Sequence, residues 1–158
     1  MKLKAHFWLL SLALVGMLLL SACGGGSTGG GTGGGAATNL SLASDGESLA
    51  FKPATLAAQA GAQVSVTFKD ASASQQHNWV LVKGGDDVAA KVDEAGATAG
   101  AAKGYIPDDP NIITSIKLLN AGESGTASFT APAAGTYTFL CTFPGHYATG
   151  MKGTFTTK

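Results

Sequence analysis

Four side chains of this sequence have the types and the spacing of a metal-binding set. Cys141, His146 and Met151 follow one another in the pattern C-x4-H-x4-M, and His77 lies 64 residues before Cys141. A thiolate and two imidazoles in a plane, with a weak axial thioether, are the ligands of a type 1 copper site. Thiolate and thioether suit Cu(I) and imidazole suits both oxidation states, so an electron can move with little rearrangement. The set therefore predicts one copper ion that alternates between Cu(I) and Cu(II).

Each of these residues, taken alone, has an ordinary structural explanation. Cys141 ends a predicted strand whose other inward residues would be Tyr137 and Phe139, where a cysteine is more often a buried apolar side chain. Met151 would usually be core or surface filler, and the two histidines could be loop residues. The combination carries the interpretation, because the chain has only three histidines and one of them, His6, lies in the N-terminal leader.

The first 22 residues have the features of a lipoprotein signal peptide. Lys2 and Lys4 precede an apolar run of about 14 residues, which is short for a membrane span but suits a signal sequence. Leu20-Ser21-Ala22-Cys23 then resembles the lipobox of bacterial lipoproteins. An ordinary signal peptide with a cysteine nearby is the alternative. We expect Cys23 to be lipidated and to anchor an exported protein to the outer, periplasmic face of the cytoplasmic membrane.

A glycine-rich segment separates the leader from the folded part. Residues 24–35 are glycine with one serine and two threonines, so they can form no core and predict a flexible tether with a reach of roughly 20 Å. We assign residues 1–22 to the signal peptide, 23–36 to the lipidated cysteine and tether, and 37–158 to one domain. Without the leader, eight lysines face ten acidic residues, a net charge of about −2, and arginine is absent. This balance argues against nucleic acid as a partner.

The sequence of the domain predicts an all-β protein. Residues 63–68, 126–129 and 136–141 alternate polar and apolar side chains, which is the period of half-buried strands. Residues 78–82 form a continuous run rich in residues that favour strands, as expected for a strand buried on both faces, and residues 153–157 close the chain. Short strands punctuated by turn signals predict a Greek-key β-sandwich of about seven or eight strands. The alanine-rich residues 86–103 break this pattern and predict a helical flap inserted between strands.

At the candidate ligands the chain resembles azurin-type cupredoxins. The matching segments are His77-Asn78-Trp79-Val80-Leu81, Cys141-Thr142-Phe143-Pro144-Gly145-His146 and Met151-Lys152-Gly153-Thr154. The methionine follows the histidine by five residues, as in plastocyanin-like sites, rather than by four as in azurins. Together with the N-terminal anchor and the glycine-rich linker, this hybrid loop looks most like the auracyanins, the cupredoxins of filamentous anoxygenic phototrophs. The resemblance covers residues 40–158.

The resemblance implies a role for each residue of the site. Cys141, His77 and His146 would bind copper equatorially and Met151 axially, with the backbone carbonyl of Gln76 on the opposite axial side. Azurins carry a disulfide near the N-terminus, but here one cysteine is committed to lipid and the other to metal, so no disulfide is expected.

The neighbours of the ligands are expected to support them. Asn78 is placed to tie the two ligand loops together, and the backbone N–H groups of Asn78 and Phe143 could donate to the Cys141 sulfur and raise the reduction potential. An ordinary loop asparagine is the alternative for Asn78.

An apolar patch is expected around the exposed edge of His146. It would consist of Phe143, Pro144, Tyr147 and Ala148, and it would serve a monomer as the docking face for a transient redox encounter. The resemblance implies a membrane quinol-oxidising complex as electron donor and a c-type cytochrome or reaction centre as acceptor. A respiratory chain fits the residues alone equally well.

Other chemistries of copper or cysteine suit the sequence less well. A multicopper oxidase or nitrite reductase needs further histidines, and a binuclear copper subunit needs two cysteines in the C-terminal loop. A Cys–His nucleophilic enzyme is conceivable with Cys141 and His146, but the following methionine suits metal better. We therefore expect an electron carrier rather than an enzyme. The alternative is a periplasmic or surface protein that binds or delivers copper, which a reversible one-electron couple would separate from a carrier.

Overall fold

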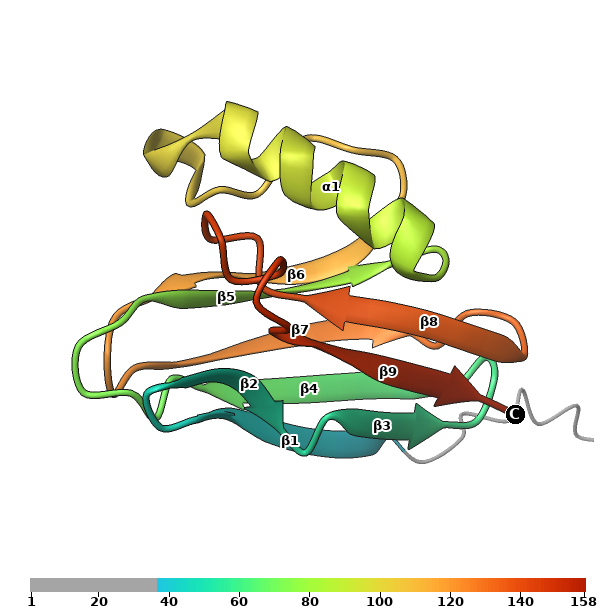
Figure 1. The fold of residues 1–158 in the computed structure, drawn as a ribbon. Coiled ribbons are helices and arrows are strands. Elements are labelled where there is room, and N and C mark those ends of the chain that lie inside the picture. Colours follow the sequence, from blue (N-terminus) through green and yellow to red (C-terminus); the bar gives the residue numbers. More distant parts are fainter. Residues whose placement is uncertain (1–36) are drawn as a thin grey trace, which may run out of the picture. The chain divides into compact units, whose positions relative to one another are not determined.

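The computed structural model describes residues 37–158. The predicted signal peptide, Cys23 and the tether of residues 23–36 lie outside the described residues. The described part forms nine strands, one α-helix and one short 3-10 helix, with the strands in two facing sheets (Figure 1). The prediction of an all-β sandwich with a helical insertion is confirmed. Between residues 37 and 158 no helix is long and apolar enough to cross a membrane.

The two sheets contain four and five strands. The smaller sheet has the order β2-β1-β4-β7, with β1 (Thr38–Asp45), β2 (Ser48–Lys52), β4 (Gln63–Lys69) and β7 (Ser124–Thr130). The larger has the order β3-β9-β8-β5-β6, with β3 (Thr55–Ala58), β5 (His77–Val82), β6 (Ile112–Leu119), β8 (Gly135–Leu140) and β9 (Lys152–Thr157). The pairs β1–β4 and β3–β9 are parallel and the other pairs are antiparallel. The chain thus passes repeatedly from one sheet to the other, as Greek-key sandwiches do.

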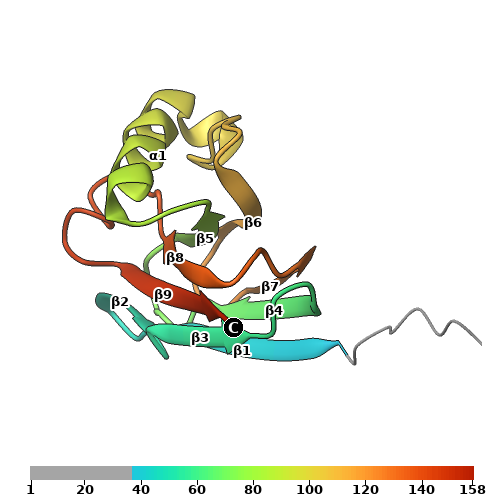
Figure 2. The same ribbon diagram turned by 90° about the vertical axis from the view of Figure 1, so that its right-hand side faces the viewer.

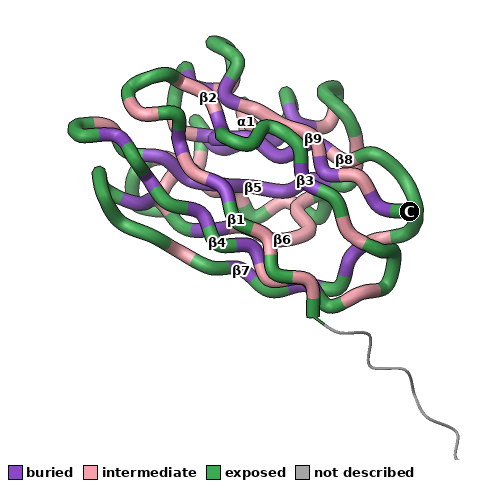
Figure 3. Tube along the Cα trace, turned by 90° about the horizontal axis from the view of Figure 1, so that it is seen from below, coloured by how far each residue is buried: buried purple, intermediate pink, exposed green. Residues whose placement is uncertain are grey.

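The main core lies between the sheets and follows the alternation of the strands. In β4, Val64, Val66 and Phe68 are buried while their neighbours are wholly or partly exposed, so one face of the strand points inward (Figure 3). The ring of Phe51 meets the ring of Phe68 edge to face with centroids 5.5 Å apart, and that of Phe139 at 5.4 Å. Each fully buried side chain of this size contributes about 1.5–3 kcal/mol relative to exposure. Cys141 and Met151, two of the candidate ligands, belong to this same core.

A second apolar cluster explains why β5 is buried on both faces. All six residues of β5 are buried. Trp79 and Leu81 belong to the core between the sheets, whereas the residues between and after them face α1 (Asp86–Ala99). Figures 1 and 2 show this helix lying over the outer face of the five-stranded sheet. The buried members of the second cluster are Val80, Val82, Ala89, Val92 and Leu140.

The inserted helix ends slightly earlier than the sequence predicts. Two acidic residues, Asp86 and Asp87, lie in its first turn, where they interact favourably with the helix dipole. The helix ends at Ala99, and Gly100 follows with a φ of 74° before a 3-10 helix, Ala101–Lys103. Gly96 is a residue with poor helix propensity, but a Cβ there would come within 2.5 Å of the backbone carbonyl oxygen of Tyr105. Only glycine allows this close approach between the helix and the loop that follows it.

Candidate functional site

The sheet brings the two ligand-bearing segments to one edge. His77 is the first residue of β5, and Cys141 directly follows the last residue of β8. These two strands are antiparallel neighbours, with Val80 paired to Leu140, so the start of one strand lies beside the end of the other. Both His77 and Cys141 are fully buried. Residues that are 64 positions apart in sequence therefore meet at one end of the sandwich.

Backbone hydrogen bonds fold residues 141–151 into a closed loop. The N–H of Cys141 donates to the carbonyl of Met151 at 3.1 Å, and the N–H of Met151 donates to the carbonyl of His146 at 2.9 Å. The N–H of His146 in turn donates to the carbonyl of Phe143 at 3.0 Å. Gly145 has a φ of 85°, a left-handed conformation that favours glycine in the turn before His146. The loop thus fixes the backbones of three candidate ligands relative to one another.

Three of the candidate side chains lie close together. The Sγ of Cys141 is 3.5 Å from Nδ1 of His146, and the ring centroids of His77 and His146 are 5.0 Å apart. Met151 is also fully buried and belongs to the same core cluster as Cys141. The side chains are gathered rather than arranged as a finished coordination sphere, because residues 37–158 contain no group of three His, Cys, Asp or Glu side chains with the geometry of a metal site.

Burial keeps the thiol and one imidazole uncharged at neutral pH. Burial raises the pKa of the Cys141 thiol to about 12, although hydrogen bonds from the backbone N–H groups of Asn78 and Phe143 act in the opposite direction. Burial, followed by repulsion from His77, lowers the pKa of His146 to about 4. His146 is therefore a neutral imidazole with a free lone pair at pH 7, while Cys141 must lose a proton before it can bind a metal ion.

The donor set fits a copper ion. Neither ring nitrogen of His77 has an aligned hydrogen-bond partner among residues 37–158, although both are buried. Buried polar atoms without partners destabilise a fold unless a ligand or another group satisfies them. Cys141 forms no disulfide within the described residues. One thiol, two imidazoles and a thioether from one end of a sandwich are suited to copper in both oxidation states.

Asn78 and Thr142 connect the two segments directly behind the candidate ligands. The side-chain amide of Asn78 donates to Oγ1 of Thr142 at 2.8 Å, and the N–H of Thr142 donates to Oδ1 of Asn78, also at 2.8 Å. Both residues are fully buried. Because Asn78 follows His77 and Thr142 follows Cys141, this reciprocal pair holds the backbone of one ligand against that of the other.

The segment that follows the inserted helix also forms hydrogen bonds with Asn78 and Thr142. The amide of Asn78 also donates to the carbonyl of Gly104 at 2.9 Å, and Oγ1 of Thr142 donates to the carbonyl of Tyr105 at 2.6 Å. Tyr105 has a φ of 60°, and no other residue except glycine has a positive φ between residues 37 and 158. This conformation costs about 1–3 kcal/mol. The sequence analysis missed Thr142, Gly104 and Tyr105, because nothing in a single sequence shows which carbonyls a buried hydroxyl will meet.

The remaining predicted residues surround the same end of the sandwich. Gln76 is held by a hydrogen bond of 2.7 Å from its amide to Oδ1 of Asn120. The ring of Phe143 lies 4.6 Å from that of His146, which is 7% exposed. The hydroxyl of Tyr147 donates to the backbone carbonyl of Asp86 in α1. Of the predicted docking patch, Pro144 and Ala148 are exposed, and Phe143 and Tyr147 are half-buried.

Comparisons with known proteins agree with this geometry. Residues 38–158 match the family described as copper binding proteins, plastocyanin/azurin family. Auracyanin-A of Chloroflexus aurantiacus is 47% identical over 152 residues, which cover 93% of this chain and 94% of that protein. Reduced auracyanin from the photosynthetic bacterium Roseiflexus castenholzii is 53% identical, with a TM-score of 0.75 over 78% of this chain and 99% of that one. An azurin from Methylomonas sp. strain J has 25% identity and a TM-score of 0.68 over 77% of this chain and 98% of that one.

Replacing Thr142 with valine tests the connection between the loops. Valine keeps the shape of threonine but removes the hydroxyl, so the carbonyl of Tyr105 and the amide of Asn78 each lose a partner. We expect the free energy of unfolding of the metal-free protein in urea to fall by about 1–3 kcal/mol. Thr126→Val is the matched control, because it removes an exposed hydroxyl bonded to Thr67 and should change stability by no more than about 0.5 kcal/mol. Equal losses in the two variants would contradict the assignment.

Proposed function

Because this chain belongs to the plastocyanin/azurin family of copper-binding proteins, which carry one type 1 copper ion, we propose that it is an electron carrier whose copper is held by His77, Cys141, His146 and Met151. The observation that carries this assignment is the contact of 3.5 Å between Cys141 Sγ and His146 Nδ1 in a buried loop. His77 contributes the second imidazole from the neighbouring strand.

Each proposed ligand has a role that its surroundings support. Cys141 would supply a thiolate to copper, His77 and His146 their imidazoles and Met151 a thioether, with the backbone carbonyl of Gln76 as a further weak donor. The thiolate of Cys141 is stabilised by the backbone N–H groups of Asn78 and Phe143, which favour its charged form. Because these bonds withdraw negative charge from the sulfur, they should raise the reduction potential.

The copper ion supplies the exchange of a single electron between Cu(II) and Cu(I). The residues of the chain hold the ligands in one arrangement for both states and exclude water from them. The backbone bonds of the 141–151 loop and the Asn78–Thr142 pair resist movement of the ligand backbones. A site that moves little on oxidation and reduction transfers electrons readily, so rigidity is the contribution of the protein to function.

The electron enters and leaves at the patch around His146. His146 is the most exposed of the proposed ligands at 7%, whereas the other three are fully buried. The proposed docking face around His146 consists of Phe143, Pro144, Tyr147 and Ala148. It suits a small and short-lived contact between the monomeric carrier and a redox partner. By analogy with relatives from photosynthetic bacteria, the donor is a membrane quinol-oxidising complex and the acceptor a c-type cytochrome or reaction centre.

Replacing Cys141 with serine tests the copper assignment. Wild-type protein loaded with Cu(II) should show an intense blue absorption band and a compressed copper hyperfine splitting in its EPR spectrum, because both arise from a thiolate bound to copper. Cys141→Ser should lose both signals. Cys23→Ser is the matched control, because it removes the other cysteine of the chain and should keep them. Weak colour that is the same in all three proteins, with no reversible one-electron couple at an electrode, would favour copper storage or delivery instead.

Membrane attachment through Cys23 belongs to the same proposal. The protein is exported and held by lipid on the outer, periplasmic face of the cytoplasmic membrane, where the tether lets the domain reach its partners. In the native host, the wild-type protein should sediment with membranes and carry the mass of attached acyl chains. Cys23→Ala should appear in the soluble fraction without that mass. Membrane attachment that persists in the Cys23→Ala variant would show that another feature anchors the protein.

A further inference from the structure

Asp70 is a fully buried carboxyl group outside the proposed ligand set. It directly follows the last residue of β4, and its side chain has no exposed surface. A buried carboxylate is costly unless hydrogen bonds or a nearby positive charge stabilise it. An aspartate at the end of a strand would ordinarily face solvent in a turn, so its burial requires an explanation.

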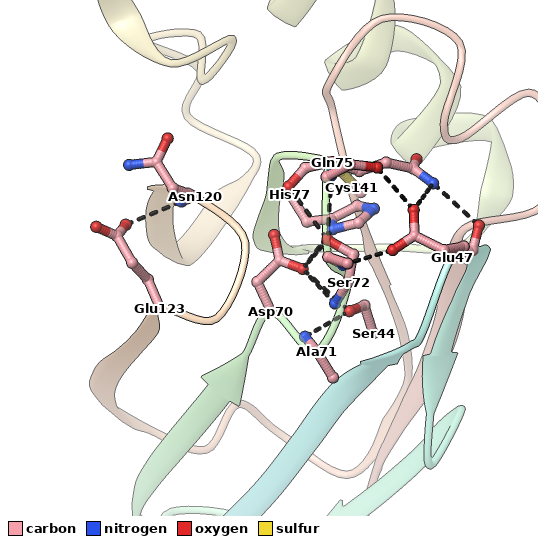
Figure 4. Close-up of polar contacts among 12 residues, drawn as sticks. Ser44, Glu47, Asp70, Ala71, Ser72, Gln75, His77, Asn120, Glu123 and Cys141 are labelled. Carbon is pink, nitrogen blue, oxygen red and sulfur yellow. Dashed lines mark hydrogen bonds and ion pairs between the residues drawn. The ribbon is translucent and has the colours of Figure 1, made fainter.

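The contacts of Asp70 are concentrated on one oxygen (Figure 4). Its Oδ1 accepts hydrogen bonds from the backbone N–H of Ser72 at 3.0 Å, from Oγ of Ser72 at 2.7 Å and from Oγ of Ser44 at 3.2 Å. The same oxygen lies 3.0 Å from Nδ1 of His77. This last contact has the distance but not the alignment of a hydrogen bond.

Three hydrogen-bond donors converge on Oδ1 of Asp70, an arrangement that suits a carboxylate, which only accepts hydrogen bonds. Asp70 therefore places a negative charge inside the protein, in contact with a proposed ligand.

The loop that carries Asp70 is tied to the scaffold from a second side. Glu47, in the turn between β1 and β2, accepts hydrogen bonds from the backbone N–H of Ala73, from Oγ of Ser74 and from the amide of Gln75 (Figure 4). Ser44 additionally accepts from the N–H of Ala71 at 2.8 Å. The segment between β4 and β5 is thus fixed along most of its length, and the Asp70 carboxylate is fixed with it.

We propose that Asp70 is a positioning residue for His77: its carboxylate holds one ring nitrogen, so that the other keeps its lone pair for copper, and it places a fixed negative charge beside the metal centre. This inference rests on the proposed role of His77 as a ligand. A histidine that binds a metal ion usually donates its second ring N–H to a carboxylate or carbonyl, which sets the tautomer and the orientation of the ring. Among residues 37–158, Asp70 is the carboxylate that contacts His77.

A purely structural role is the competing explanation. Asp70 would then only bind Ser44 and Ser72 and hold the loop, and its loss would affect stability without affecting the metal. The two explanations differ in the reduction potential and in the affinity for Cu(II). A negative charge near the site favours Cu(II) over Cu(I), so its removal should make the potential more positive.

The test uses Asp70→Asn, which is similar in size but uncharged, in the copper-loaded protein. We expect the blue band to persist, the reduction potential to become more positive, and the affinity for Cu(II) to fall at least tenfold. Glu47→Gln is the matched control, because it weakens the same loop from an exposed position that does not touch His77. It should lower stability without changing the potential or the affinity.

A second measurement needs no substitution. In the diamagnetic Cu(I) form of the wild-type protein, NMR should show a ring N–H of His77 that is shifted downfield by hydrogen bonding and exchanges slowly with water. The proposal is overturned if this proton exchanges freely, or if Asp70→Asn lowers stability but leaves the potential and the affinity unchanged. Those outcomes would still leave the blue band in place, whereas a wild-type protein without the band would refute the copper assignment itself.

Discussion

The reciprocal hydrogen bonds between Asn78 and Thr142 are the constraint on which the site depends. They join two segments that are 64 residues apart, directly behind His77 and Cys141. In a sandwich, strands β5 and β8 can bring these segments to one edge, but strand pairing alone leaves the residues after the strand ends free to move. The buried bonds remove that freedom, and the carbonyls of Gly104 and Tyr105 extend them into the inserted segment. The insertion therefore stabilises the ligand loops as well as covering one face of the sheet.

Burial affects the proposed ligands and the polar residues behind them in different ways. Apolar surroundings keep the Cys141 thiol and the His146 ring uncharged. The neutral imidazole has a free lone pair for a metal ion, whereas the thiol must first lose its proton. Several polar groups behind them are buried in the same surroundings and hydrogen-bond with one another. Asn78 and Thr142 do so behind Cys141, and Asp70 with its serines lies behind His77. Replacing any one of these groups would leave others without partners, so each replacement is expected to destabilise the fold around the candidate site.

Local patterns in the sequence predicted much of this architecture. The alternation in residues 63–68 correctly predicted β4. The strand-favouring run of residues 78–82 correctly predicted a strand buried on both faces, and α1 covers its outer side. The helix was predicted from the alanine content of residues 86–103. Four strands, β1, β2, β3 and β6, were not assigned. β3 is a four-residue edge strand in which only Leu56 is buried, so it is too short for a period to be visible. Length does not explain β1 and β6, which have eight residues each.

In the candidate site, too, some residues could be predicted from the sequence and others could not. Cys141, His146 and Met151 could be found because their spacing is local and their side chains have distinctive chemistry. Asp70 and Tyr105 could not, because an aspartate after a strand and a tyrosine after a glycine look like ordinary turn residues. Their roles depend on contacts with His77 and Thr142 that only the folded chain creates.

The central claim is that a buried neutral thiol becomes the thiolate that binds copper. Calorimetric titration of the metal-free protein with Cu(II) at pH 8, in buffers of different ionisation enthalpy, counts the protons released on binding. Since the pKa of Cys141 is about 12, the thiol is protonated at this pH. The wild-type protein should therefore release about one proton more per copper ion than Cys141→Ser, whose hydroxyl stays protonated. Equal proton release by the two proteins would show that Cys141 does not bind the metal as a thiolate.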